Sequence, residues 1–258
     1  MTIDTTLEAA WYPSPNFEPR RDGMKPYILL LHYTGMETAE RALYWLCTEE
    51  SKVSCHYMID EEGRITQTVR ENMRAWHAGR ACWNGETDIN SASIGIEIHN
   101  PGPGWGYPDF PEAQMCAVES LSRDIISRYD IVSHHVLGHS DVAPMRKADP
   151  GEKFDWGRLA RAGIGHWVPP APAAGDDGLG LGDTGDGVKR LQCLLASYGY
   201  HVPESGVFDE ETEKVVTAWQ RHFRPALVNG RADCSTFDTL SRLIKALPQE
   251  YRRFPSQP

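Results

Sequence analysis

Two histidines and one aspartate have the residue types and positions expected of metal ligands. His32 and His139 each end an apolar run, and Asp149 lies ten residues beyond His139 on a loop rich in proline and glycine. Two neutral imidazoles and one carboxylate form a common ligand set for Zn²⁺, and they leave a fourth position open for water. A structural zinc site would instead be closed by four protein ligands. These residues therefore predict a catalytic zinc site.

The composition is that of an ordinary globular protein that can bury at least one large core. The chain has 258 residues, of which 40% are hydrophobic and 24% are charged. The formal net charge of −10 argues against unspecific binding to nucleic acid or to anionic membranes, because both favour basic surfaces. The six cysteines are scattered without a CxxC pair, so we expect reduced thiols without a chemical role.

The first residues lack the pattern of a secretory signal. No basic segment precedes an apolar stretch there, and no apolar stretch approaches the roughly 20 residues that a membrane span requires. The sequence as it stands therefore favours a cytoplasmic location.

Strands alternate with helices in the first two thirds of the chain. The apolar periodicity predicts, in order, a strand at 27–32, a helix at 38–50 with Thr38 as its N-cap, a hairpin formed by 55–59 and 64–68, a strand at 93–98 and a helix at 111–129. This order predicts an α/β fold, in which a mixed β-sheet is flanked by helices.

A segment rich in proline, alanine and glycine at residues 168–178 divides the chain. Such a composition predicts an extended, semi-rigid spacer without packed structure, between a catalytic domain at 1–167 and a small domain at 179–258. Helical periodicity in the small domain predicts a three-helix bundle, with helices at 187–198, at 210–223 and after Asp233 or Ser235. Its aromatic residues Trp219 and Phe223 are expected in the bundle core.

Five motifs of the first domain resemble, in order, the zinc-dependent N-acetylmuramoyl-L-alanine amidases of the AmpD/AmiD type. They are Leu-His-Tyr-Thr at 31–34, Ser-Cys-His-Tyr at 54–57, Arg-Ala-Trp-His-Ala-Gly at 74–79, Ile-Gly-Ile-Glu-Ile at 94–98 and the segment 136–151. The resemblance implies the fold of peptidoglycan recognition proteins. It also implies hydrolysis of the amide bond between N-acetylmuramic acid and L-alanine, in cell-wall degradation or muropeptide recycling.

The same resemblance assigns roles to seven residues. It implies that Zn²⁺ is bound by His32, His139 and Asp149, that Glu97 is the general base, that Lys147 stabilises the oxyanion, and that Trp76 and His77 bind the substrate. A packing role for His77 remains an alternative.

Glu97 is favoured as the base for two reasons. On its predicted strand the isoleucines alternate with Gly95 and Glu97, so the carboxylate points away from the apolar face. Some relatives place a catalytic tyrosine just before the position of His56, where this chain has Cys55.

The small domain resembles the peptidoglycan-binding three-helix domain. The resemblance depends on the turn sequences at 182–188, 198–200 and 206–209 and on Trp219-Gln220. It implies that the partner is peptidoglycan or a muropeptide, and it favours a periplasmic or cell-envelope location as the alternative to the cytoplasm. The sequence does not indicate an oligomeric state.

Two further interpretations remain open. The chain could be a non-catalytic module that binds muropeptides, or a zinc hydrolase of another amide. No HExxH motif is present. His134 and His135 precede the metal-ligand motif and are expected in solvent.

Overall fold

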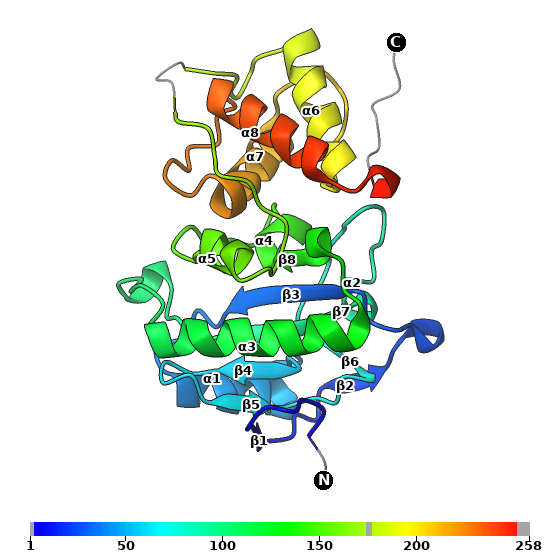
Figure 1. The fold of residues 1–258 in the computed structure, drawn as a ribbon, viewed down its shortest axis with the longest axis vertical. Helices are drawn as coiled ribbons and strands as arrows, with labels where there is room; N and C mark the ends of the chain where they lie inside the picture. The colour runs from blue at the N-terminus through cyan, green and yellow to red at the C-terminus, as the bar shows by residue number, and fades with distance from the viewer. Residues whose placement is uncertain (1–2, 174–176, 252–258) are drawn as a thin grey trace.

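The computed structural model describes residues 3–173 and 177–251. A six-stranded sheet with the order β1-β5-β4-β7-β3-β8 forms the centre of the first domain (Figure 1). Its neighbouring strands are parallel except for β4 and β5, which form the predicted hairpin. A separate antiparallel pair consists of β2 and β6. The strands are β1 Ala10–Trp11, β2 Phe17–Pro19, β3 Ile28–Tyr33, β4 Tyr57–Ile59, β5 Ile65–Gln67, β6 Met73–Ala75, β7 Ser93–Ile98 and β8 Val136–Gly138.

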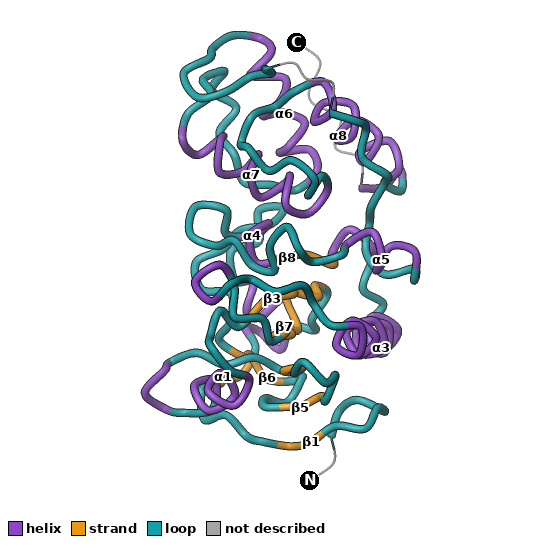
Figure 2. Tube along the Cα trace, turned by 90° about the vertical axis from the view of Figure 1, so that its left-hand side faces the viewer, coloured by secondary structure: helices purple, strands orange, loops and turns teal. Residues whose placement is uncertain are grey.

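Helices cover both sides of this sheet, so the predicted α/β fold with flanking helices is confirmed. Figure 2 shows α1 and α3 on opposite sides of the strands. The α-helices are α1 Ala39–Leu46, α2 Ile89–Ala92, α3 Glu112–Tyr129, α4 His139–Val142, α5 Trp156–Arg161, α6 Asp186–Tyr198, α7 Glu210–Phe223 and α8 Cys234–Ala246. Short 3₁₀ turns lie at Arg21–Gly23, Glu49–Ser51, Pro103–Trp105, Ser133–His135 and Gln249–Tyr251.

The apolar face of the sheet lies against α3. The three isoleucines of β7 are fully buried there with Val118 and Leu121 of α3. At the start of α1 the side chain of Thr38 accepts a hydrogen bond from the backbone N–H of Arg41, which confirms the predicted N-cap. This packing leaves the opposite side chains of β3 and β7 free to build a site.

The last three helices form the predicted small bundle. Trp219 and Phe223 are almost completely buried in it, as expected from the sequence. The side chain of Asp233 accepts from the backbone N–H of Thr236, so Asp233 is the N-cap of α8. Figure 1 shows the bundle stacked on the end of the first domain that carries β8, α4 and α5. Packing of α7 against α4 places the bundle beside the predicted ligand His139, which begins α4.

The spacer before the bundle is not free of packing. The backbone N–H of Ala171 donates to Thr239 Oγ1 at 2.9 Å, and Ser235 Oγ donates to the carbonyl of Ala171 at 2.6 Å. The expectation of an unpacked spacer is therefore wrong at Ala171, because polar side chains of α8 satisfy its backbone. Residues 174–176 of the spacer lie outside the described residues, and the domain limits 1–167 and 179–258 stay predictions.

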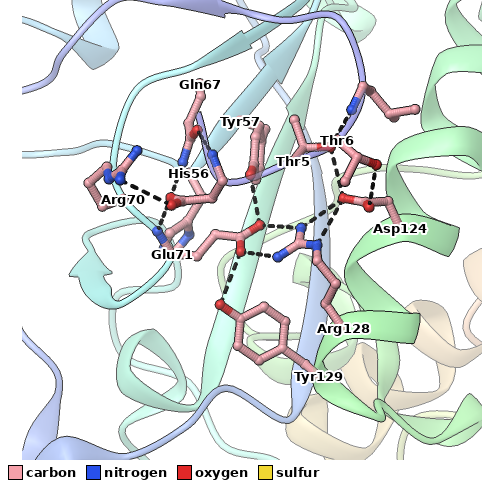
Figure 3. A network of polar contacts seen from close by, with 12 residues as sticks. Thr5, Thr6, His56, Tyr57, Gln67, Arg70, Glu71, Asp124, Arg128 and Tyr129 are labelled. Carbon is pink, nitrogen blue, oxygen red and sulfur yellow. Dashed lines mark hydrogen bonds and ion pairs between the residues drawn. The ribbon is translucent and has the colours of Figure 1, made fainter. Parts of the chain in front are cut away.

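A buried polar network anchors the start of the chain to α3 (Figure 3). The carboxylate of Glu71 is 1% exposed and accepts hydrogen bonds from Tyr57, Arg128 and Tyr129. Arg128 also donates to Asp124, whose carboxylate accepts from the hydroxyl groups of Thr5 and Thr6. Because each charged group in the network has a charged or polar partner, its burial is not left uncompensated.

The expectation that His134 lies in solvent is wrong. This histidine is 3% exposed, not solvated, and its ring lies 4.2 Å from the ring of Tyr251 beyond α8. Burial lowers the pKa of His134 to about 3. Residues near the far end of the chain therefore cover a side chain that the local sequence places in solvent.

All six cysteines are free thiols. Among residues 3–173 and 177–251, no helix has the length and apolar character needed to cross a membrane.

Candidate metal and catalytic site

Three predicted ligands converge at the ends of neighbouring strands. His32 lies near the end of β3, His139 begins α4 directly after β8, and Asp149 lies on the loop that follows. His32 Nδ1 lies 2.9 Å from His139 Nδ1 and 3.2 Å from Asp149 Oδ2, and the last two atoms are 3.0 Å apart. Donor atoms around a tetrahedral zinc ion, with bonds of about 2.0–2.1 Å, are separated by about 3.3 Å. The donor set and its spacing fit one small divalent cation.

The outer nitrogens of both imidazoles are already engaged by the protein. His139 Nε2 lies 3.0 Å from the carbonyl oxygen of Ala78, which can only accept a hydrogen bond. His32 Nε2 lies 3.0 Å from Nδ1 of His77. With a proton on each Nε2, both Nδ1 atoms present a lone pair to the point that lies between them and Asp149 Oδ2. We call this point the shared centre. Metal-binding histidines commonly have their second nitrogen held in this way.

His77 contacts the outer nitrogen of the predicted ligand His32 and is largely buried. It is 8% exposed, and its Nε2 lies 3.4 Å from the hydroxyl of Ser93. Its ring fits against β7 only because residue 95 is glycine, since a Cβ there would lie 2.6 Å from the ring. The contact with His32 fits the packing alternative, in which His77 orients His32. His77 also lines the cavity over the site, so its contact with substrate stays a prediction.

Glu97 lies beside His32 on the adjacent strand. The two residues are register partners of β3 and β7, and the isoleucines that flank Glu97 face α3. Glu97 Oε2 is buried and has no hydrogen-bond partner among the described residues. Burial, with the nearby carboxylate of Asp149, raises the pKa of Glu97 well above its usual value, and Lys147 partly opposes this. An unpartnered carboxyl group of raised pKa is suited to accept a proton.

Two of the predicted ligands, His32 and Asp149, are held in the protonation states that bind metal. Burial, together with neighbouring His139, lowers the pKa of His32 to about 4. Burial alone would raise the pKa of Asp149, but His139 and His32 outweigh this effect and hold it well below the usual range. At neutral pH His32 is neutral and Asp149 is ionised, as metal coordination requires.

A cavity of about 510 Å³ opens over the site. The predicted site residues that line it are Trp76, His77, Glu97, His139, Lys147 and Asp149. The indole N–H of Trp76 is buried without a partner, and Lys147 forms no ion pair among residues 3–173 and 177–251. Six of the seven predicted site residues therefore line one cavity, and the seventh, His32, contacts three of them.

Three supporting residues were not predicted from the sequence. Asn90 Oδ1 accepts from the backbone N–H groups of His77 and Ala78, at 3.0 and 2.7 Å. Arg146 donates to the same Ala78 carbonyl that holds His139. The adjacency of Arg146 to Lys147 is a signal that could have identified it, whereas no local pattern distinguishes Asn90.

The third is Arg20, which is buried and supports His56. Its guanidinium group lies 3.0 Å from His56 Nε2. It donates to the backbone carbonyls of Asn90 and Ser91 in α2 and of Ser93 at the start of β7. His56 Nδ1 accepts from the N–H of Gly95 at 2.9 Å. His56 is thus held on both ring nitrogens by the protein and has a structural role.

Comparison with protein families gives two matches. Residues 22–152 match the family described as N-acetylmuramoyl-L-alanine amidase, and residues 184–240 match a model of a peptidoglycan binding domain.

Comparison with curated proteins gives relatives of the same kind. N-acetylmuramoyl-L-alanine amidase AmiD of Escherichia coli (strain K12) is 36% identical in an alignment of 252 residues that covers 90% of this chain and 89% of the relative. 1,6-anhydro-N-acetylmuramyl-L-alanine amidase AmpD of Citrobacter freundii is 32% identical in an alignment of 169 residues that covers 59% of this chain and 88% of the relative.

Solved structures resemble the whole chain. The complex of E. coli AmiD with the substrate anhydro-N-acetylmuramic acid-L-Ala-D-gamma-Glu-L-Lys has a TM-score of 0.73 at 36% identity, covering 88% of this chain and 92% of AmiD. AmpDh3 of Pseudomonas aeruginosa in complex with anhydromuramic pentapeptide has a TM-score of 0.71 at 30% identity, covering 90% and 94%.

Proposed function

The chain belongs to the N-acetylmuramoyl-L-alanine amidase family, and from this premise we propose that His32, His139 and Asp149 bind its catalytic zinc ion. The reaction of the family is hydrolysis of the amide bond between N-acetylmuramic acid and L-alanine. The observation that carries the zinc proposal is the shared centre of the two Nδ1 atoms and Oδ2, with both outer nitrogens engaged by the protein. When bound, zinc would polarise the scissile carbonyl and acidify a water molecule.

Glu97 is the general base in this proposal. Its Oε2 accepts the proton of the attacking water and later transfers it to the amine of L-alanine as that group leaves. The support is its position beside His32, its lack of a hydrogen-bond partner among the described residues, and its raised pKa.

Lys147 and Trp76 act on the substrate. The ammonium group of Lys147 stabilises the oxyanion that develops on the scissile carbonyl, and Trp76 contributes its indole N–H and ring to the substrate-binding wall. His77, which lines the same cavity, also holds His32 in the orientation that directs Nδ1 to the metal.

The proposed substrates are muropeptides derived from peptidoglycan. AmiD and AmpDh3 have been solved with anhydromuramic peptides, and the bundle of this chain matches a peptidoglycan binding domain. The bundle favours the intact polymer as a second substrate form. Comparing the products released from whole sacculi and from soluble anhydro-muropeptide would measure the preference.

The first experiment measures peptide release by the Glu97→Ala and Glu97→Gln variants. We expect both to keep stoichiometric zinc and to lose roughly 10²–10⁴-fold in turnover, because removal of a general base commonly costs this much. Glu49→Gln, at an exposed glutamate, is the control with unchanged turnover. Full activity of the Glu97 variants would reject the assigned role.

A second measurement separates the amidase from a non-catalytic recognition module. The zinc-loaded protein is incubated with a muropeptide, with and without a chelator, and release of the peptide that begins with L-alanine is followed. We expect release that the chelator abolishes. Binding of the muropeptide without any release by the zinc-loaded protein would favour the recognition module.

A further inference from the structure

Helix α7 of the C-terminal bundle lies directly behind the segments that carry His139 and Asp149. His222 Nδ1 on α7 lies 2.7 Å from Asp141 Oδ2 on α4. The ring of the same histidine stacks on Trp156, which begins α5, with centroids 3.7 Å apart and an interplanar angle of 18°. These contacts join the bundle to both ends of the ligand-bearing segment.

Asp141 is the centre of this contact. It is 1% exposed and lies two residues after the ligand His139. Its carboxylate accepts three hydrogen bonds, from the backbone N–H of Gly138 at 2.7 Å, from the hydroxyl of Tyr200 at 2.6 Å and from His222. Only the first donor belongs to the amidase domain. A buried carboxylate is costly unless such partners are present, so the bundle stabilises its position.

The hydrogen bond that the N–H of Gly138 donates to Asp141 connects this carboxylate to the metal site. Gly138 immediately precedes His139 and is the N-cap residue of α4, so the bond holds the backbone from which the ligand projects. The position is also tightly packed, because a Cβ on Gly138 would lie 2.8 Å from Pro150, the residue after Asp149. Movement of Asp141 would therefore disturb the segments of two ligands.

We propose that Tyr200 and His222 of the C-terminal bundle are positioning residues for the amidase site, which act through Asp141 on the metal ligand His139. This inference rests on the proposed zinc site. It gives the bundle a role beyond binding of the polymer: two of its side chains complete the support of a catalytic ligand. Metal sites require their ligands to be held within about 0.5 Å, and loss of supporting partners commonly costs 10–100-fold in metal affinity.

Two tyrosines of the same interface provide a matched test in the full-length chain. Tyr198 and Tyr200 are both buried and both lie edge-on to Trp83, but the hydroxyl of Tyr198 contacts His166 at 2.8 Å and that of Tyr200 contacts Asp141. Zinc affinity is measured by competition with a chelator, the ligand geometry by the visible spectrum of the Co²⁺ form, and stability by urea unfolding of the metal-free protein.

We expect Tyr200→Phe to weaken zinc binding about tenfold and to change the Co²⁺ spectrum, as for loss of an outer hydrogen bond at a metal site. Tyr198→Phe removes a similar buried hydroxyl, so it lowers the stability comparably but leaves zinc affinity within about twofold of the wild type. Equal zinc affinities for the two variants would overturn the proposal.

His222 provides a rescue experiment. His222→Leu removes the donor to Asp141, whereas His222→Asn retains an N–H near the position of Nδ1. We expect weakened zinc binding in the leucine variant and restoration of most of the affinity in the asparagine variant. Unchanged affinity in the leucine variant, with the wild type binding zinc and cleaving muropeptide, would overturn only this inference. Failure of the wild type to bind zinc would overturn the proposed function as well.

Discussion

His32 and His139 each direct one ring nitrogen toward the protein and the other toward the shared centre. This arrangement leaves one nitrogen of each ring available to bind a cation. The carbonyl of Ala78 and the ring of His77 engage the outer nitrogens. An imidazole that is held in this way needs no rotation or proton shift before it binds a cation. The site is therefore organised for metal by hydrogen bonds that the ligand residues alone do not reveal.

Lys147→Met tests the oxyanion role at the residue scale. The substitution keeps the length of the side chain and removes its charge, so we expect kcat to fall about 100-fold, as when one oxyanion donor is lost, while KM and zinc content stay close to wild type. Steady-state cleavage of a soluble muropeptide measures this effect. Lys245→Met, at an exposed position on α8, is the control. A change confined to KM would assign Lys147 to substrate binding alone.

The central strands β3 and β7 carry the proposed site residues on one face of the sheet and apolar core residues on the other. Because β3 and β7 are parallel and in register, His32 lies opposite Glu97, and a shift of one residue would turn Glu97 toward α3. Gly95 has a second role on β7, because only a residue without Cβ leaves room for His77. The strand thus supplies the proposed base and the space for the residue that orients a ligand.

Gly95→Ala tests this requirement at the scale of the element. The added methyl group would meet the His77 ring at 2.6 Å, so we expect a loss of about 1–3 kcal/mol in the free energy of unfolding, as for overpacking, and weaker zinc binding. Urea unfolding of the metal-free protein and chelator competition measure the two effects. Gly104→Ala is the control, because a Cβ there has nothing within 4 Å. Equal zinc affinity in both variants would show that His77 does not support His32.

At the scale of the whole molecule the bundle and the amidase domain share one core. Trp83 of the first domain is 1% exposed and contacts the rings of Tyr198 and Tyr200. Gly199 between the two tyrosines is necessary for this approach, because a Cβ on it would lie 2.6 Å from the indole. The bundle is thus packed onto the amidase domain.

The cytoplasmic location, with the cell envelope as its alternative, stays a prediction.

Burial of His134 predicts a loss of stability in acid. Its pKa is about 3 in the folded protein and about 6.5 when the chain is unfolded, so the unfolded state binds the additional proton between these values. The contribution of His134 to stability is complete above about pH 6.5 and is lost as the pH falls toward 3. The slope of the unfolding free energy against pH is proportional to the number of protons taken up on unfolding. We expect His134→Phe to lower this number by up to one in the window between about pH 3 and about pH 6.5.

Urea unfolding of the metal-free wild type and variant at pH 7 and pH 5 measures this effect. The control is His201→Asn, which replaces an exposed histidine of the bundle and should leave the difference between the two pH values unchanged. The prediction fails if His134→Phe and the wild type lose the same stability on acidification.

The local sequence determined the fold class, the order of the main elements and the three side chains proposed as metal ligands. Alternating and helical periodicities act within a few residues, as in β7 and α3, and strand ends bring His32 and His139 together whenever their strands are neighbours. The orientation of the proposed base Glu97 could also be predicted, because it follows from the alternation along one strand.

Only the tertiary structure decided the features that depend on distant partners. Asp141 and His222 are separated by 81 residues, and the ring of Tyr251 covers His134 from the other end of the chain. The orienting role of His77 likewise depends on a contact with His32 across 45 residues. Hydrophobic periodicity along the chain does not predict such pairs, because their contacts form only when the elements pack together.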